Sequence, residues 1–110
     1  MKKSTTKKIP TEHQEQVKFI SWFRKAFPDV LIHAIPNGGS RHIATAVKLK
    51  AEGVVAGIPD LHIPEWNLYI EMKRSKGGVL SKSQRSVIDH LVNICKKHVV
   101  IGHGFADAKE

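Results

Sequence analysis

Asp60, Glu71 and Lys73 are the residues whose types and spacing most directly suggest chemistry. Side chains two positions apart on a β-strand lie on the same face, so the segment Glu71-Met72-Lys73 would place a carboxylate and an ammonium group side by side. Carboxylate oxygens suit hard divalent cations such as Mg²⁺ or Mn²⁺. A neighbouring ammonium group could orient an attacking water molecule, lower its pKa or stabilise charge that develops on a phosphate.

A predicted β-hairpin brings the two carboxylates together. Its strands and turn are expected at residues 60–63, 68–73 and 64–67. If Ile63 lies opposite Leu68, then Asp60 lies opposite Glu71, with Cβ atoms roughly 4.5–5.5 Å apart; a two-residue turn at residues 65–66 gives the same pairing. The carboxylates would then repel each other, and a bound cation would remove the repulsion. The same residues could instead form only a salt-bridge pattern on a solvated surface.

An amphipathic helix is predicted over residues 12–27, with a capping box that begins at Thr11. Its apolar stripe consists of Phe19, Ile20, Phe23, Ala26 and Phe27. Glu12 falls within this core-facing stripe, with Gln16 about 40° and Glu15 about 60° away on either side. Because a buried carboxylate needs a partner, Glu12 could extend the acidic site; alternatively, it only complements the helix dipole at an exposed first turn.

A second capping box, from Ser81 to Gln84, begins another predicted helix. The apolar stripe of this helix consists of Val87, Ile88, Leu91, Val92 and Cys95. Gln84 lies in line with this stripe and could therefore point inward to the expected site. Alternatively, it serves only in the capping box.

The remaining predicted elements are a strand over residues 30–35, a helix over 41–52 with Ser40 as its cap and Gly53 at its end, and a strand over 99–101. The order α-β-α-β-β-α-β indicates an α/β fold with a mixed β-sheet flanked by helices. We expect one domain over residues 10–110, preceded by a disordered basic tail of residues 1–9.

The charge balance indicates an acidic partner. Eighteen Lys and Arg residues against ten Asp and Glu residues give a net charge of +8, which is typical of a nucleic-acid binder but also occurs in proteins that are merely soluble. The candidate DNA contacts are Asn37, Arg41, His42, Arg74, Lys76, Lys82 and Arg85. The seven histidines show no metal-ligand spacing, although alternation places His62 beside Asp60 and His33 could contact phosphate.

Several segments, taken in order, resemble the VRR-Nuc family of nucleases. They are Glu12-x₃-Gln16, Pro36-Asn37-Gly38-Gly39, Leu49-x₃-Gly53, Gly57-Ile58-Pro59-Asp60-Leu61, Ile70-Glu71-Met72-Lys73 and Leu80-Ser81-x₂-Gln84. An isolated Asp…Glu-x-Lys pattern arises often by chance, whereas this ordered set extends over residues 11–104.

The resemblance implies a restriction-endonuclease-like core of the PD-(D/E)xK type and hydrolysis of phosphodiester bonds with Mg²⁺ or Mn²⁺. The implied metal ligands are Asp60, Glu71, the backbone carbonyl of Met72 and Glu12, with Glu15 as the alternative to Glu12. Lys73 matches the catalytic lysine, and Gln16 and Gln84 match supporting polar positions. Stand-alone members of phage or bacterial origin cleave four-way (Holliday) junctions as homodimers, so branched DNA and a second copy are the expected partners.

Other classes of protein fit the sequence less well. No segment approaches the roughly 20 apolar residues that span a bilayer, so no membrane partner is expected. The single cysteine, Cys95, forms no internal disulfide and offers no cysteine-based zinc site, and we expect a cytoplasmic protein of a bacterial or phage-infected cell. The alternatives to a junction-cleaving endonuclease are a non-catalytic DNA-binding module and a nuclease that acts on flaps or duplex DNA.

Overall fold

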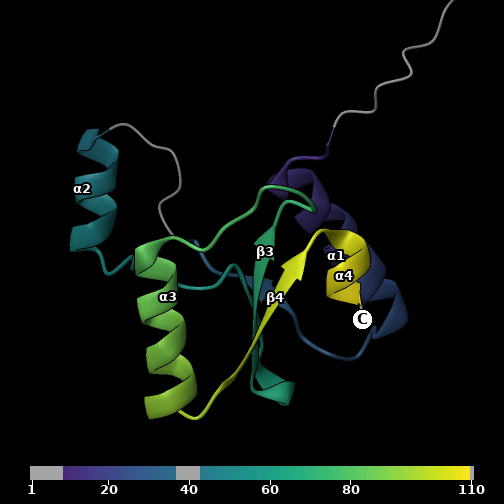
Figure 1. Cartoon of the computed structure of the whole chain (residues 1–110). Coiled ribbons are helices and arrows are strands. Elements are labelled where there is room, and N and C mark those ends of the chain that lie inside the picture. Colours follow the sequence, from purple (N-terminus) through teal and green to yellow (C-terminus); the bar gives the residue numbers. More distant parts are fainter. Residues whose placement is uncertain (1–8, 37–42, 110) are drawn as a thin grey trace, which may run out of the picture.

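A four-stranded β-sheet organises the chain, for which a computed structural model describes residues 9–36 and 43–109 (Figure 1). The strands are β1 (His33–Ala34), β2 (Leu61–Ile63), β3 (Leu68–Lys73) and β4 (His98–His103), in the order β1-β2-β3-β4. The β1–β2 and β2–β3 pairs are antiparallel, and β4 runs parallel to β3. The helices are α1 (Glu12–Ala26), α2 (Ile43–Ala51), α3 (Lys82–Asp89) and α4 (Phe105–Lys109). This mixed sheet flanked by helices is the fold class that the sequence predicts.

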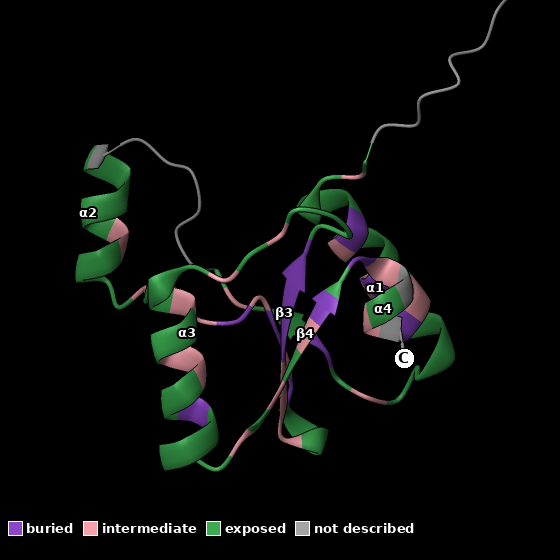
Figure 2. Ribbon diagram, viewed as in Figure 1, coloured by how far each residue is buried: buried purple, intermediate pink, exposed green. Residues whose placement is uncertain are grey.

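The sheet separates two helical layers, with α1 and α4 on one face and α3 on the other (Figure 1). The buried core lies on the α1 side and consists of Phe19, Phe23, Ile32, Leu61, Ile63, Ile70 and Met72. Buried residues therefore concentrate in β3 and on the inner side of α1 (Figure 2). Because side chains alternate along a strand, the core position of Ile70 and Met72 directs Glu71 and Lys73 to the other face, toward α3. No helix in the described part of the chain is long and apolar enough to cross a bilayer.

The β2–β3 hairpin has the predicted register. Ile63 pairs with Leu68, and the two preceding positions of β2 pair in the same register with β3. The turn is a short 3₁₀ segment, η1 (Pro64–Trp66), which is followed by Asn67 in the left-handed region at φ 53°. β2 begins one residue later than predicted, and Asp60 precedes it with its carbonyl oxygen accepting a hydrogen bond from the Ile35 amide at 2.8 Å.

Several elements differ in extent from the prediction. The strand expected over residues 30–35 contains only His33 and Ala34, because β1 is an edge strand and the Leu31 amide bonds instead to the Glu65 carboxylate. β4 is longer than the expected residues 99–101, and α4 follows it without having been predicted. Ser40 and the expected start of the second helix lie outside the described residues, as do residues 1–8 of the expected tail.

Both predicted capping boxes are present, at Thr11 with Gln14 and at Ser81 with Gln84. The stripe of α3 is buried at Leu91, which lies in a terminal π-helical turn, η2 (His90–Ile94), whereas Val92 and Cys95 are exposed.

The prediction that Glu12 faces the core is wrong, because Glu12 is exposed and Glu15 is the buried acidic residue of α1. The buried residues of α1 are Glu15, Phe19 and Phe23, whereas Ala26 and Phe27 of the predicted stripe are exposed. Burial of Glu15 is possible because its Oε1 accepts a hydrogen bond of 3.0 Å from the Phe105 amide at the start of α4.

Replacing Glu15 with alanine should destabilise the protein, because the substitution removes the acceptor of a part-buried amide and with it a hydrogen bond between α1 and α4. We expect the free energy of unfolding, measured by urea denaturation, to fall by about 1–3 kcal/mol. The matched control is Glu12→Ala in the same helical turn, which removes an exposed carboxylate and should change stability by less than about 0.5 kcal/mol. Equal effects of the two substitutions would contradict a structural role for Glu15.

Candidate active site

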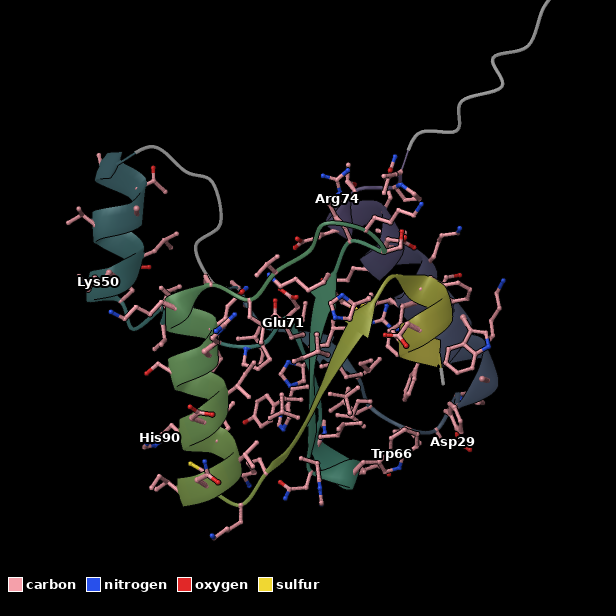
Figure 3. All side chains as sticks on the ribbon, in the orientation of Figure 1. Asp29, Lys50, Trp66, Glu71, Arg74 and His90 are labelled. Atoms are coloured by element: carbon pink, nitrogen blue, oxygen red, sulfur yellow. The ribbon has the colours of Figure 1, made fainter. Side chains whose placement is uncertain are left out.

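Gln84 connects the two charged residues of β3. Its Nε2 donates a hydrogen bond of 2.9 Å to Glu71 Oε2, and its Oε1 accepts one of 2.8 Å from Lys73 Nζ. Lys73 Nζ lies 3.7 Å from the same Glu71 oxygen, and both charged side chains are buried. Figure 3 shows Glu71 in the space between β3 and α3. The amide of Gln84 thereby fixes the relative position of the carboxylate and the ammonium group.

The local sequence explains why Gln84 points to β3. Ser81 is the N-cap of α3, and its hydroxyl accepts a hydrogen bond of 3.1 Å from the backbone N–H of Gln84. The backbone N–H of Ser81 donates in turn to the side-chain oxygen of Gln84, Oε1, at 2.8 Å. The side-chain oxygen of Gln84 therefore serves both the helix cap and Lys73. Gln84 therefore takes part in the capping box and also points to Glu71 and Lys73.

Asp60 reaches the same end of β3 from the loop that precedes β2. Its Oδ2 accepts a hydrogen bond of 2.8 Å from the Met72 amide. The N–H and C=O of one strand residue point to the same side, so the Met72 carbonyl also faces the Asp60 side. The Lys73 carbonyl faces β4, where it accepts from the Gly104 amide at 2.8 Å. Two carboxylates and the Met72 carbonyl are thus brought together at this end of the sheet.

Gly57 allows the loop that carries Asp60 to touch the first turn of α3. Its φ is +90°, and an added Cβ would lie 2.5 Å from the carbonyl carbon and oxygen of Ser83 and 2.8 Å from the Gln84 amide nitrogen. Any side chain at residue 57 would therefore collide with backbone atoms. No structural role is predicted for this glycine from the sequence, although its position before Pro59-Asp60 is a signal for one.

The environment of Glu71 opposes its ionisation. Burial, followed by the nearby Asp60 carboxylate, raises the pKa of Glu71 to about 8, against the opposing effect of Lys73. Only 1% of the Glu71 surface is exposed, and its Oε1 has no hydrogen-bond partner among the described residues. A buried carboxylate oxygen without a donor is costly unless a proton or a cation binds there.

Glu12 and Glu15 occupy different environments. The Glu12 charge contributes to the raised pKa of Glu71, so this exposed carboxylate lies within electrostatic range of the site. Glu15 is engaged with the Phe105 amide instead. Gln16 is half-buried, and within the described part of the chain it makes no hydrogen bond to Glu71 or Lys73.

The candidate DNA contacts that can be located are exposed and flank the site. Arg74 directly follows Lys73, as Figure 3 shows at the end of β3, and Lys76 belongs to the next loop. Lys82 and Arg85 lie on the first turns of α3, close in sequence to Gln84. Asn37, Arg41 and His42 lie outside the described residues.

The site has few carboxylates for a metal site, but its oxygen atoms are of the kind that bind a divalent cation. The described residues contain no group of three or more His, Cys, Asp or Glu that could hold a metal ion. The vicinity of Glu71 Oε1 nevertheless combines a buried oxygen without a donor, the Asp60 carboxylate and the side of β3 that carries the Met72 carbonyl. Oxygen ligands of this kind suit Mg²⁺ or Mn²⁺, with water completing the coordination.

Stability should depend on pH through Glu71. Between its ordinary pKa of 4.5 and its folded value of about 8, the folded protein keeps a proton that the unfolded chain releases, so stability falls as pH rises through this interval. Glu71→Gln removes this dependence. In metal-free buffer, urea unfolding should show that the variant gains stability relative to the wild type between about pH 5 and about pH 8. A difference that does not change with pH would contradict the raised pKa.

Comparisons with known proteins reveal a structural relative. No family model matches the chain, and none of the curated proteins matches it. Among solved structures, the chain is similar to one described as a VRR_NUC domain protein, with a TM-score of 0.73 and 26% sequence identity over 92% of this chain and 84% of that chain. The shared architecture agrees with the ordered sequence segments that end at Gln84 and supports the resemblance to the VRR-Nuc family.

Proposed function

We propose that the protein is a metal-dependent endonuclease that hydrolyses phosphodiester bonds in DNA. The observation that carries the proposal is the buried Glu71 carboxylate, which has one oxygen bound to Gln84 and the other without a hydrogen-bond partner among the described residues. A group that only formed salt bridges on a surface would be solvated, whereas this carboxylate is buried next to a second one. The likeness to a VRR_NUC domain protein supports nuclease chemistry as the use of such a site.

In this mechanism Asp60, Glu71 and the Met72 carbonyl would hold Mg²⁺ or Mn²⁺, and the exposed Glu12 would add negative charge nearby. The bound cation would polarise the phosphate and lower the pKa of an attacking water molecule. Lys73, held by Gln84, keeps its ammonium group beside Glu71 and stabilises charge that develops on the phosphate or orients the water molecule. Gln84 acts as a positioning residue.

The substrate we propose is branched DNA, with the four-way junction as the leading candidate. The net charge of +8 favours binding to phosphates, and Arg74, Lys76, Lys82 and Arg85 surround the site on exposed positions. A four-way junction has two-fold symmetry, and a C₂ homodimer of this 12.3 kDa chain would present two sites related in the same way. This proposal rests on the family resemblance and on the size of the chain. We propose that the protein acts in the cytoplasm of a bacterial or phage-infected cell.

Cleavage of a labelled four-way junction, compared with linear duplex of the same sequence, tests the activity and the substrate together. We expect paired cuts in the junction with Mg²⁺ or Mn²⁺ and none with EDTA. Lys73→Ala should lower the cleavage rate by about a hundredfold or more, because it removes the group that stabilises charge in the transition state.

The matched control is Lys25→Ala, which removes an exposed lysine at the other end of α1 and should leave cleavage unchanged. Cleavage of flaps or duplex but not junctions would retain the nuclease and reject the resolvase. DNA binding without any strand scission would reject catalysis and favour a non-catalytic binding module.

Metal binding can be measured without activity by thermal unfolding. A cation at ten times its dissociation constant should stabilise the wild type by about 1.4 kcal/mol, which corresponds to several degrees for a domain of this size. Glu71→Gln should abolish most of the shift. Because the cation competes with a proton on Glu71, the shift should be larger above the pKa of about 8 than near pH 6. Equal shifts in the wild type and Glu71→Gln would exclude Glu71 as a ligand.

A further inference from the structure

Three ring side chains form a continuous row across β1, β2 and β3. His33 pairs with His62, and His62 pairs with Tyr69, in the strand register. His33 Nε2 lies 3.0 Å from His62 Nδ1, and the two rings are nearly perpendicular at 81°. The rings of His62 and Tyr69 are stacked, with centroids 4.4 Å apart and an angle of 17°. We call these three residues the ring row.

The ring row lies on the same face of the sheet as the candidate active site. Tyr69 precedes Glu71 by two positions on β3, so their side chains share a face and are separated by about 7 Å along the strand. His62 has the same relation to Asp60 on the neighbouring chain segment. The row therefore starts next to the proposed catalytic centre and extends toward the β1 edge, where His33 is exposed.

The surroundings of the ring row suit a nucleic-acid strand. Among the described residues, the hydrogen bonds of His33 and His62 join them to each other and to the Ala34 carbonyl, and none involves a carboxylate. Burial, His33 and the positive charge of Lys97 lower the pKa of His62, which places that lysine close to the row. Rings beside a lysine combine a surface for stacking with a cation for phosphate.

We propose that the ring row is a subsite for an unpaired nucleobase of the DNA strand that enters the active site, with Lys97 near the backbone phosphate. In duplex DNA both faces of each base are covered by its neighbours, and only the base edges are accessible in the grooves. Rings on a sheet surface can therefore contact a base face only where the strand is unpaired. The location of the subsite next to the scissile bond rests on the proposed nuclease function.

The subsite accounts for a preference for branched DNA through a contact that a duplex cannot make. At a junction or a flap, bases at the branch point are exposed or easily unstacked. A base held by the ring row would place the adjoining phosphate within the space near Glu71 and Lys73. Selection by structure then requires no reading of sequence, because every base has a face that can stack.

The test uses fluorescence anisotropy with EDTA, so that no cleavage can occur. The probes are a fluorescein-labelled single-stranded thymidine oligonucleotide and an oligomer of the same length in which abasic residues replace the central thymidines. Wild type should bind the thymidine probe at least about fivefold more tightly than the abasic probe. His33→Ala should weaken binding to the thymidine probe by a similar factor and leave the abasic probe unaffected, since removal of either the ring or the base removes the same contact.

Three further variants define the contact. His33→Phe should retain the preference for thymidine, because it keeps a ring that can stack, whereas loss equal to that of His33→Ala would reject stacking. Tyr69→Ala should reduce the preference independently of His33, because it removes the ring that supports His62. His90→Ala removes an exposed histidine of η2 and should behave as wild type with both probes.

The two proposals fail separately in this design. Equal loss of affinity for both probes in His33→Ala, or no loss for either, would reject the subsite even if the wild type cleaves junctions with Mg²⁺. A base preference that depends on His33 in a protein that never cleaves DNA would retain the subsite for unpaired bases and reject the nuclease.

Discussion

The burial of the Glu71 carboxylate is the constraint on which the rest of the site depends. A charged oxygen removed from water must be compensated, and the fold supplies compensation on one side only, through Gln84 and Lys73. The neighbouring Asp60 carboxylate increases the electrostatic cost of a negative charge on Glu71. Two neighbouring carboxylates in a buried position destabilise the fold when no cation is bound. The same pair of carboxylates would favour the binding of a cation.

The elements around Glu71 can be understood as the means to hold this arrangement. β3 alternates between the core, which anchors Met72, and the α3 face, which receives Glu71 and Lys73. The Ser81 N-cap fixes the start of α3 and thereby the position of the Gln84 side-chain amide relative to the sheet. Gly57 lets the loop before Asp60 lie directly against this helix start, since no side chain separates the two backbones. Each contact is local, but together they tie three distant segments of the chain to one carboxylate.

Local sequence patterns predicted the hairpin and the helix starts that form the site. The hairpin register followed from alternation and turn length, and the capping boxes from the spacing of Thr11 with Gln14 and of Ser81 with Gln84. The environments that depend on tertiary packing were not predictable in the same way. Hydrophobic periodicity placed Glu12 inside and could not foresee that the Phe105 amide would provide a partner for Glu15. The stacking of His62 on Tyr69 required the register, but its connection to His33 also required the position of β1. The roles proposed for Glu12, Asp60, Glu71, Lys73 and Gln84 stay predictions.

The double use of the Gln84 side-chain oxygen has a consequence for the order in which the chain is synthesised. The Lys73 ammonium group and the amide of Ser81 bind the same atom, so Lys73 is held in position only when the first turn of α3 has formed. A nascent chain that has emerged from the ribosome as far as β3 carries Asp60, Glu71 and Lys73 but lacks the residue that orders them. The hydrogen bond between Lys73 and Gln84 can therefore form only after residues 81–84 have left the exit tunnel.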